Sequence, residues 1–171
     1  QIFHPTWSNN HGLEFAETEV RNTNSNHWQG YATTEQQLAA NGSITVPVPA
    51  ITSGAIIGLS TMDANRPNLQ YPEFGIYHNQ NGTMRIWGRS GPVKDIGILQ
   101  PNDTLTVERL DNQLQYYVND QLHHTTSIAS DVPLVGQIVF RDVDHVMGLP
   151  TLRDAERPSL DPEAVDEVFN E

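Results

Sequence analysis

The sequence contains no cysteine, so neither disulfide bonds nor thiolate metal sites contribute to its fold. Lysine occurs only once, at Lys94, and nine basic residues stand against 21 acidic ones, for a net charge of −12. The basic stripe that would follow a nucleic-acid backbone is missing, and anionic membrane surfaces are disfavoured for the same reason. No apolar run approaches the ~20 residues that cross a bilayer. We therefore expect neither nucleic-acid binding nor membrane insertion.

The length of 171 residues fits one domain, or one domain with a tail, and such a chain buries ~70% of its unfolded surface. It begins at Gln1 without a methionine or a signal-type apolar segment, so either a leader has been removed or the chain has been trimmed. Acidic charge and abundant Asn, Gln and Thr suit a secreted surface. We expect an extracellular or cell-surface location. Three Asn-x-Ser/Thr sequons are explained by chance in such a composition.

Residues 54–120 form a run of short strand-like pieces, and no segment among them repeats like a helix. Turn residues separate these pieces at hairpin spacing, at Asn81-Gly82, Gly91-Pro92, Pro101-Asn102-Asp103 and Asp111-Asn112. Chains of this kind bury themselves as two facing antiparallel sheets. The sequence therefore predicts an all-β, two-sheet antiparallel sandwich over residues 1–152.

Further strands are predicted on both sides of this run. Residues 43–48 alternate with period two, and Pro47 and Pro49 place an edge or an end there, because proline cannot donate to a ladder. We assign Trp7 and Trp28 to the core or to packing between strands. The remaining predicted strands are two short ones within residues 12–20, a central apolar one at 55–59, and those at 134–140 and 143–149.

The composition changes after Leu152, and residues 153–171 hold seven acidic residues and two arginines. Asp161 as N-cap and Pro162 at the first helical position predict a short helix. Its apolar side chains share one face, and so short a helix must dock to be stable. The predicted docking residues, on this domain or on another chain, are Val165, Val168 and Phe169.

Residues from about Trp28 to Phe140 resemble the concanavalin A-like lectin/glucanase superfold, and bacterial surface modules of that class in particular. The matching pieces, in the expected order, are residues 28–38, Gly58-Leu59-Ser60, Phe74-Gly75-Ile76-Tyr77, Gly82 with Trp87, residues 103–109, and Tyr116-Tyr117-Val118-Asn119. The resemblance implies a jelly-roll sandwich exported to the cell surface, with a role in adhesion or glycan binding. This chain departs from the pattern at Asn119-Asp120, where Asn-Gly is usual, and has no obvious aromatic sugar platform in one loop.

Glycoside hydrolases of the same superfold need two carboxylates that flank one bond. If residues 142–144 form a strand, Asp142 and Asp144 share a face. Laminarinase-type enzymes have a Glu-x-Asp-x-x-Glu pattern on such a strand, and both outer glutamates are missing here. We therefore expect no catalysis, and interpret Asp142 and Asp144 as solvated or cation-binding residues.

Calcium is a candidate ligand, because it prefers oxygen donors from Asp, Asn and backbone carbonyls. The segment 61–73 offers several such groups, to which Asp142 and Asp144 could add. No spacing matches a known calcium loop, which favours a polar turn. Adjacent His123 and His124 point to opposite faces of a strand and cannot chelate together, and we expect them, like His145, to be ordinary histidines.

Sugar binding needs an aromatic face with polar neighbours. By strand alternation Trp87 shares a face with Arg85 and not with Ile86, which indicates exposure. The predicted ligand-binding residues are Asp63, Asn65, Tyr71, Glu73, Trp87 and Arg89.

The sequence thus favours a non-enzymatic extracellular module that binds a glycan or a cell-surface protein through loops at one end of a rigid sandwich. One alternative is an assembly subunit that associates with itself or with neighbouring subunits through its tail and sheet edges. A weaker alternative is a polysaccharide-cleaving enzyme.

Overall fold

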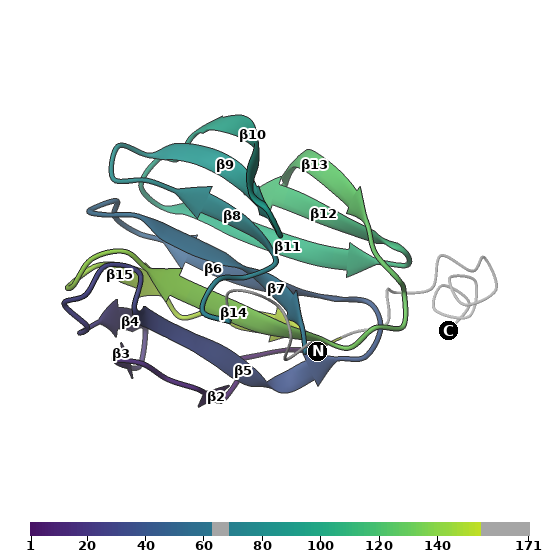
Figure 1. Ribbon diagram of the computed structural model, residues 1–171, viewed down its shortest axis with the longest axis horizontal. Coiled ribbons are helices and arrows are strands. Elements are labelled where there is room, and N and C mark those ends of the chain that lie inside the picture. The colour runs from purple at the N-terminus through teal and green to yellow at the C-terminus, as the bar shows by residue number, and fades with distance from the viewer. Residues whose placement is uncertain (63–68, 155–171) are drawn as a thin grey trace, which may run out of the picture.

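The computed structural model describes residues 1–62 and 69–154, and every regular element in these ranges is a β-strand that pairs antiparallel (Figure 1). Two large sheets stack as a sandwich, and a three-stranded sheet lies beside them and contacts β5 and β6. The predicted all-β, two-sheet antiparallel architecture is confirmed. The described residues include no helix long and apolar enough to span a bilayer. The predicted tail helix, with Val165, Val168 and Phe169, lies outside the described residues.

One large sheet has seven strands and carries the candidate site. Its central strands β7 and β14 are buried along their whole length, as predicted for residues 55–59 and 134–140. In spatial order the strands are β10 (Gly91–Ile98), β9 (Thr83–Gly88), β8 (Phe74–His78), β7 (Ala55–Thr61), β14 (Leu134–Phe140), β5 (Gly30–Leu38) and β2 (Trp7–Ser8).

The other large sheet has six strands. The small sheet pairs strands of the N-terminal region with a strand close to the end of the described chain. The six strands are, in spatial order, β1 (Ile2–Phe3), β16 (Thr151–Arg153), β6 (Gly42–Val48), β11 (Asp103–Leu110), β12 (Gln113–Val118) and β13 (Gln121–Ser127). The small sheet consists of β15 (Val146–Gly148), β4 (Glu19–Asn22) and β3 (Leu13–Phe15).

Alternating apolar residues of the two large sheets meet in one core. On β7, Ala55, Ile57 and Leu59 point inward, and they pack with Leu105 and Val107 of β11 in the same buried cluster. Burying each such aliphatic side chain contributes about 1.5–3 kcal/mol. The opposite side of β7 and its sheet is called the outer face below.

Residues that were predicted to form turns adopt the backbone conformations that turns require. Gly82 (φ +88°), Asn102 (φ +73°) and Asp111 (φ +56°) supply the left-handed conformations that close three hairpins or corners. Asn119 (φ +55°) does the same in the turn between β12 and β13, where the sequence departs from the usual Asn-Gly. The departure therefore leaves this hairpin intact.

The two prolines near the end of β6 act locally. β6 is an interior strand, because it pairs with β11 on one side and β16 on the other. The ladder to β16 stops at Thr45, two residues before Pro47, so the missing N–H of Pro47 falls where β6 has one neighbour. The prediction that the strand ends or lies at an edge near Pro47 and Pro49 is confirmed, because β6 ends at Val48.

Three parts of the sequence were interpreted wrongly or incompletely. Gly91-Pro92 begins β10 instead of only closing a turn, and β13 was not predicted as a strand. The predicted strand at 143–149 is reduced to β15, which pairs with β4 in the N-terminal region as expected. Asp142 and Asp144 consequently lie in a turn and not on a strand.

Candidate functional site

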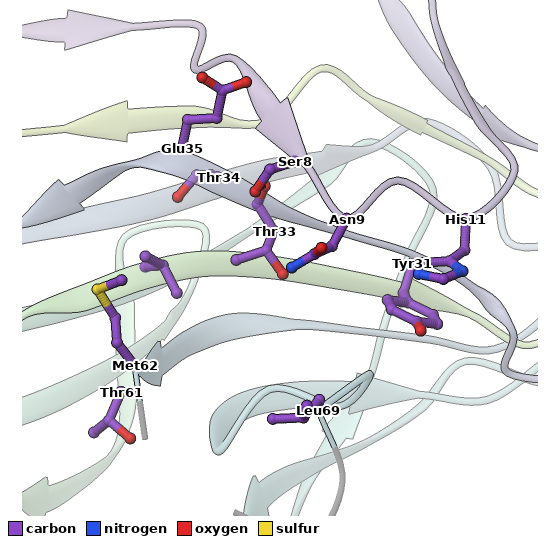
Figure 2. A pocket seen from close by; sticks show the side chains of 11 residues that line it. Ser8, Asn9, His11, Tyr31, Thr33, Thr34, Glu35, Thr61, Met62 and Leu69 are labelled. Atoms are coloured by element: carbon purple, nitrogen blue, oxygen red, sulfur yellow. The ribbon is translucent and has the colours of Figure 1, made fainter. Parts of the chain in front are cut away.

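The outer face of the seven-stranded sheet carries two neighbouring features. Over β2, β5 and β14 lies a groove of about 580 Å³, whose lining side chains are drawn in Figure 2. Over β8 and β9 lies a group of four aromatic rings, Trp28, Tyr71, Tyr77 and Trp87, which we call the aromatic patch. Leu69 lines the groove and Tyr71 belongs to the patch, so the two features adjoin at residues 69–71.

The four rings of the aromatic patch contact one another in a closed circuit. Tyr71 and Tyr77 each lie 5.7–5.9 Å, centroid to centroid, from both Trp28 and Trp87. All four side chains are half-buried, and none belongs to the core cluster between the sheets. Aromatic pairs at these distances stabilise one another by about 0.5–1.5 kcal/mol beyond area burial. The patch is therefore an ordered aromatic surface on the outside of the sandwich.

Strand register positions Tyr77 and Trp87. Gly75 pairs with Trp87 and Tyr77 with Arg85, so Tyr77, Arg85 and Trp87 share the outer face while Ile76 and Ile86 point into the core. The predicted shared face of Trp87 and Arg85 is confirmed. Arg85 is held by Asp95 on β10, at 2.9 Å from Nε to Oδ1.

Two glycines lie next to Trp87 on the outer face of the sheet. Gly58 of β7 pairs with Gly75 of β8, which in turn pairs with Trp87. A Cβ on Gly58 would lie 2.0 Å from the carbonyl oxygen of Phe74, and one on Gly75 would lie 2.5 Å from that of Ile57. Neither position accepts a side chain unless the backbone moves, and both glycines are buried, so β7 and β8 lie close together next to Trp87.

Trp28 reaches the aromatic patch from a loop, not from a strand. Its backbone is left-handed (φ +61°), its N–H donates to the carbonyl of Arg141 at 3.0 Å, and its ring lies close to Gly54. The sequence placed Trp28 in the core or between strands, and this was wrong. No local pattern signals its position, because a distant turn determines it.

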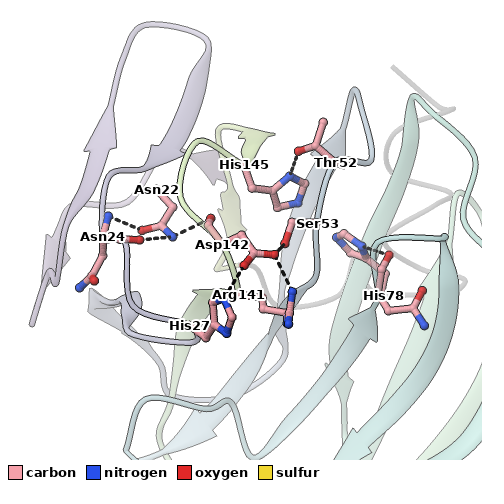
Figure 3. Close-up of polar contacts among 10 residues, drawn as sticks. Asn22, Asn24, His27, Thr52, Ser53, His78, Arg141, Asp142 and His145 are labelled. Atoms are coloured by element: carbon pink, nitrogen blue, oxygen red, sulfur yellow. Dashed lines mark hydrogen bonds and ion pairs between the residues drawn. The ribbon is translucent and has the colours of Figure 1, made fainter.

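That turn and the Trp28 loop are joined by a polar network (Figure 3). The buried Asn22 side chain donates to the carbonyls of Asp142 (2.8 Å) and Asn24 (3.2 Å) and accepts from the N–H of Asn24 (3.0 Å). The backbone N–H of Asp144 donates to the carbonyl of Asn22 at 2.7 Å. Asn22 thus fixes the start of the Trp28 loop against residues 142–144.

Asp142 is the charged centre of the same network. Its carboxylate accepts a hydrogen bond from Ser53 and pairs with Arg141 (2.8 Å) and His27 (3.1 Å). The hydrogen bond from Ser53, followed by the charges of Arg141 and His27, lowers the pKa of Asp142 although partial burial opposes it. Asp144 lies in a left-handed turn (φ +68°) and is exposed. The two carboxylates predicted to bind a cation therefore do not line one strand face.

Acidic side chains do not cluster at a metal site within the described residues. No three His, Asp or Glu side chains within residues 1–62 and 69–154 come together in a group that could hold a metal ion. The oxygens of Asp142 are engaged by protein donors, as above. Asp63 and Asn65, which were predicted as ligand-binding residues, lie outside the described residues.

Glu73 and Arg89 lie together at the edge of the aromatic patch. The buried Glu73 carboxylate accepts from the N–H (2.9 Å) and the hydroxyl of Thr61, and it pairs with Arg89 at 2.7 Å. Arg89 is largely exposed and also lies over the Phe74 ring, 5.4 Å from its centroid. Of the predicted ligand-binding residues, the structure thus brings Tyr71, Glu73, Trp87 and Arg89 into one region, where Glu73 anchors the segment that carries Tyr71.

Two buried histidines lie behind the network. The rings of His78 and His145 are 5.5 Å apart, and neither Nε2 atom has a hydrogen-bond partner. Nδ1 of His145 bonds the hydroxyl of Thr52 at 2.9 Å, and Nδ1 of His78 lies 3.3 Å from the carbonyl of Asn79. Burial lowers the pKa of each to about 4, so both are neutral at pH 7.

Comparisons with known proteins identify the fold and no more. No family model and no curated protein matches the chain in sequence. Among solved structures, the lumenal domain of VIP36 bound to Ca²⁺ and Man3GlcNAc is similar over 93% of this chain and 87% of its own, at 9% identity and a TM-score of 0.60. The potassium-bound carbohydrate recognition domain of Emp46p is similar over 88% and 89%, at 13% identity and a TM-score of 0.61.

An enzyme also occurs among the similar structures. A mutant sialidase of Trypanosoma rangeli with trans-sialidase activity matches 86% of this chain but 27% of its own length, at 13% identity and a TM-score of 0.55. At such identities the likeness establishes a concanavalin A-like sandwich, and the function must be argued from the site.

Proposed function

We propose that this chain is a non-enzymatic module that binds glycans through the outer face of its seven-stranded sheet. The observation that carries the proposal is the aromatic patch: four half-buried rings, ordered by contact with one another, on the outside of the sandwich. Sugars present C–H faces that pack on aromatic rings, and neighbouring polar groups fix their hydroxyls. The similarity to a carbohydrate recognition domain and to a domain bound to Man3GlcNAc supports the same class.

The proposal moves the binding surface away from loops at one end of the sandwich. Tyr77 and Trp87 lie on strands, while Trp28 and Tyr71 come from connecting segments that fold over the same face. A rigid sheet supports the two strand residues, which limits the ordering entropy lost on binding. An extracellular location belongs to this proposal as well, on the compositional grounds given above.

Hydrolysis is not proposed. The carboxylate pair that the sequence offered, Asp142 and Asp144, lies in a turn, and Asp142 already bonds Ser53, Arg141 and His27. A glycoside hydrolase needs one free acid and one free base or nucleophile on either side of the sugar bond. Incubating the protein with the glycans that it binds should release no reducing ends.

The test is a binding screen on neutral oligosaccharides of one to six residues, with a sialylated and a uronic-acid oligosaccharide as acidic probes. For any glycan that binds, Trp87→Ala should weaken affinity at least about tenfold, the loss typical of an aromatic anchor. Trp87→Phe, which keeps a ring, should retain most of the affinity. Tyr117→Ala, a half-exposed tyrosine on the six-stranded sheet, is the control.

EDTA provides a further arm of the screen. Because the described carboxylates form no metal site, binding through the aromatic patch should not change when calcium is removed. Loss of binding in EDTA, restored by calcium, would contradict this and point to oxygen donors outside the described residues. Failure of every glycan on the panel to bind would contradict the proposed function itself.

An assembly role is the second candidate, favoured by the edges of the two large sheets. β10 is a nearly fully exposed edge strand with Val93 and Ile98 about 59% and 56% exposed, and Leu122 projects from the edge strand β13. Lys94 reaches from β10 to the carbonyl of His123 on β13, so the two edges adjoin. Exposed edges of this kind pair with other chains. Sedimentation velocity over a range of concentrations separates this candidate from a monomeric binder.

A further inference from the structure

The groove beside the aromatic patch has polar groups that the protein itself does not use. Tyr31, Thr33 and Glu35 alternate on the outward side of β5, and Asn9 and His11 lie beside them on the segment that follows β2 (Figure 2). None of these five side chains makes a hydrogen bond or ion pair with the described residues. The cavity of about 580 Å³ is therefore lined by polar groups that can hydrogen-bond to a ligand: a hydroxyl, an amide, a phenol, a carboxylate and an imidazole.

The groove wall is held in place although its polar atoms are free. The His11 ring stacks on the Tyr31 ring at 4.1 Å, and the N–H of His11 donates to the carbonyl of Tyr31 at 2.8 Å. β2 pairs with β5 through Trp7 and Ser8, which fixes the start of the same wall. The groove is preorganised, so a ligand loses little of its binding free energy to ordering the protein.

The charge of the side chains that line the groove favours an uncharged ligand. Glu35 is the one charged side chain among the described residues that line the groove, and no lysine or arginine is among them. A carboxylate or sulfate on a ligand would meet this acid, and the chain as a whole carries a charge of −12. Uncharged hydroxyls, in contrast, donate to Glu35 and accept from Asn9 or Thr33.

The groove and the aromatic patch lie on one face at a spacing that suits a chain of sugars. Tyr31 pairs with Val139, Val139 with Ile56, and Ile56 with Tyr77, so three strand spacings separate Tyr31 in the groove from Tyr77 in the patch. At about 4.8 Å per spacing the separation is roughly 14 Å. A single monosaccharide does not cover this distance, whereas an oligosaccharide does.

We propose that the groove is a second subsite for the same glycan, and that the ligand is an uncharged oligosaccharide long enough to occupy both the aromatic patch and the groove. This inference rests on the proposed function, because it assumes that the aromatic patch binds sugar. It adds two properties, a minimum length of the ligand and discrimination against acidic saccharides.

The experiment measures affinities for the neutral oligosaccharide series that the wild-type protein binds on the panel, from one to six residues. Glu35→Gln and Asn9→Ala should each weaken binding of the longer members by up to about tenfold, as expected when a hydrogen bond to the ligand is lost. Affinity for the shortest members, which fill the aromatic patch alone, should not change. Asp120→Asn, an exposed acid in the turn before β13, is the control for Glu35→Gln.

The outcomes separate this inference from the proposed function. If Trp87→Ala abolishes binding while Glu35→Gln and Asn9→Ala leave every chain length unaffected, the second subsite is wrong and the aromatic patch stands. If Trp87→Ala also has no effect, or no glycan binds, both are wrong. Tight binding of the sialylated or uronic-acid probe by the wild-type protein, unaltered by Glu35→Gln, would overturn the predicted selectivity.

Discussion

Single residues far from the aromatic patch determine where Trp28 lies. Asn22 is fully buried, and its side-chain nitrogen serves two backbone carbonyls, one of them that of Asp142. Gly30 lies so close that a Cβ there would be 1.9 Å from Oδ1 of Asn22, so the amide fills its space completely. Because Asn22 orders the loop that carries Trp28, we regard it as a positioning residue for the site.

The first prediction concerns this amide. Asn22→Ala leaves two carbonyls without their donor and should lower the free energy of unfolding by about 2 kcal/mol. It should also weaken glycan binding and change the Trp28 indole signal, because the loop loses its anchor. Asn112→Ala, in the exposed turn between β11 and β12, is the control for urea unfolding and for binding. A variant as stable as wild type and with unchanged affinity would contradict the role.

The second prediction concerns pH. His78 and His145 have folded-state pKa values of about 4, below the ordinary 6.5, because burial disfavours the charged form. Between pH 6.5 and about 4 the unfolded chain binds protons that the folded chain does not, so stability should fall as pH falls through this window. Each histidine contributes of the order of 3 kcal/mol. The pKa of Asp142 is lowered by the hydrogen bond from Ser53. Protonation of Asp142 therefore lowers the stability only at more acidic pH.

Urea unfolding at several pH values measures this dependence. In His78→Phe the slope between pH 6.5 and 4 should be shallower than in the wild type, whereas His4→Phe, an exposed histidine, should not alter it. A wild-type profile that is flat across the window would show that the buried pair does not control acid stability.

At the scale of residues, part of the site could be predicted from the sequence. Trp87 was predicted to be exposed because strand alternation is a local property, and Tyr71, Glu73 and Arg89 were proposed from their residue types in polar segments. Trp28 could not be placed, since its position depends on hydrogen bonds to residues more than a hundred positions away. The groove residues Asn9, Thr33 and Glu35 gave no signal either, because isolated polar residues on a strand do not reveal which wall faces them.

At the scale of elements, one buried arginine joins three segments of the sandwich. Arg109 of β11 is fully buried and donates to the carbonyls of Leu38, the last residue of β5, and Ala40, each at 2.8 Å, and to that of Val132 before β14. Burial lowers its pKa, and Asp131 partly offsets this. No described carboxylate within salt-bridge distance pairs with it, so backbone carbonyls satisfy the charge. The arginine thereby fixes the chain as it passes between sheets.

The third prediction follows from this arrangement. Arg109→Leu removes the donors of several buried carbonyls and should cost about 3 kcal/mol or more in urea unfolding. Arg109→Lys keeps the charge but cannot reach all the carbonyls, so it should fall between leucine and wild type. Arg85→Leu, whose partner Asp95 is exposed, should change stability by less than about 1 kcal/mol. A loss for Arg109→Leu as small as that for Arg85→Leu would contradict the account.

Strands were predictable where one face is buried and one is not. β9 and β11 alternate in the sequence and in burial, and the apolar runs of β7 and β14 matched central strands. β10 escaped prediction because it is exposed on both faces and begins with Gly91-Pro92, residues that also signal turns. The supposed strand through Asp142 and Asp144 is a turn, since Asp144 adopts a left-handed conformation that no alternation pattern reports.

At the scale of the whole molecule, the described chain ends next to its beginning. β16 pairs with β1, and the N–H of Asp154 donates to the carbonyl of Gln1 at 3.2 Å. The sandwich is therefore closed before the acidic segment 155–171 begins. We therefore expect binding through the outer face of the seven-stranded sheet not to require that segment.

The fourth prediction tests this independence. Truncation after Asp154, which keeps β16 complete, should leave glycan affinity and the sedimentation coefficient of a monomer unchanged. If the chain is instead an assembly subunit that docks through Val165, Val168 and Phe169, the full-length protein should form oligomers and the truncated protein should lose them. That result would favour the assembly role over the binding module.

The central claim is that sugar binds on the aromatic patch, and the three tryptophans allow the most direct test. A ¹H–¹⁵N NMR titration with a neutral oligosaccharide from the panel follows their indole N–H signals, assigned by single Trp→Phe variants. Trp28 and Trp87 should shift on binding, while Trp7, which stacks on Phe15 against the core, should not. Saturable binding that leaves both Trp28 and Trp87 unmoved would contradict the account.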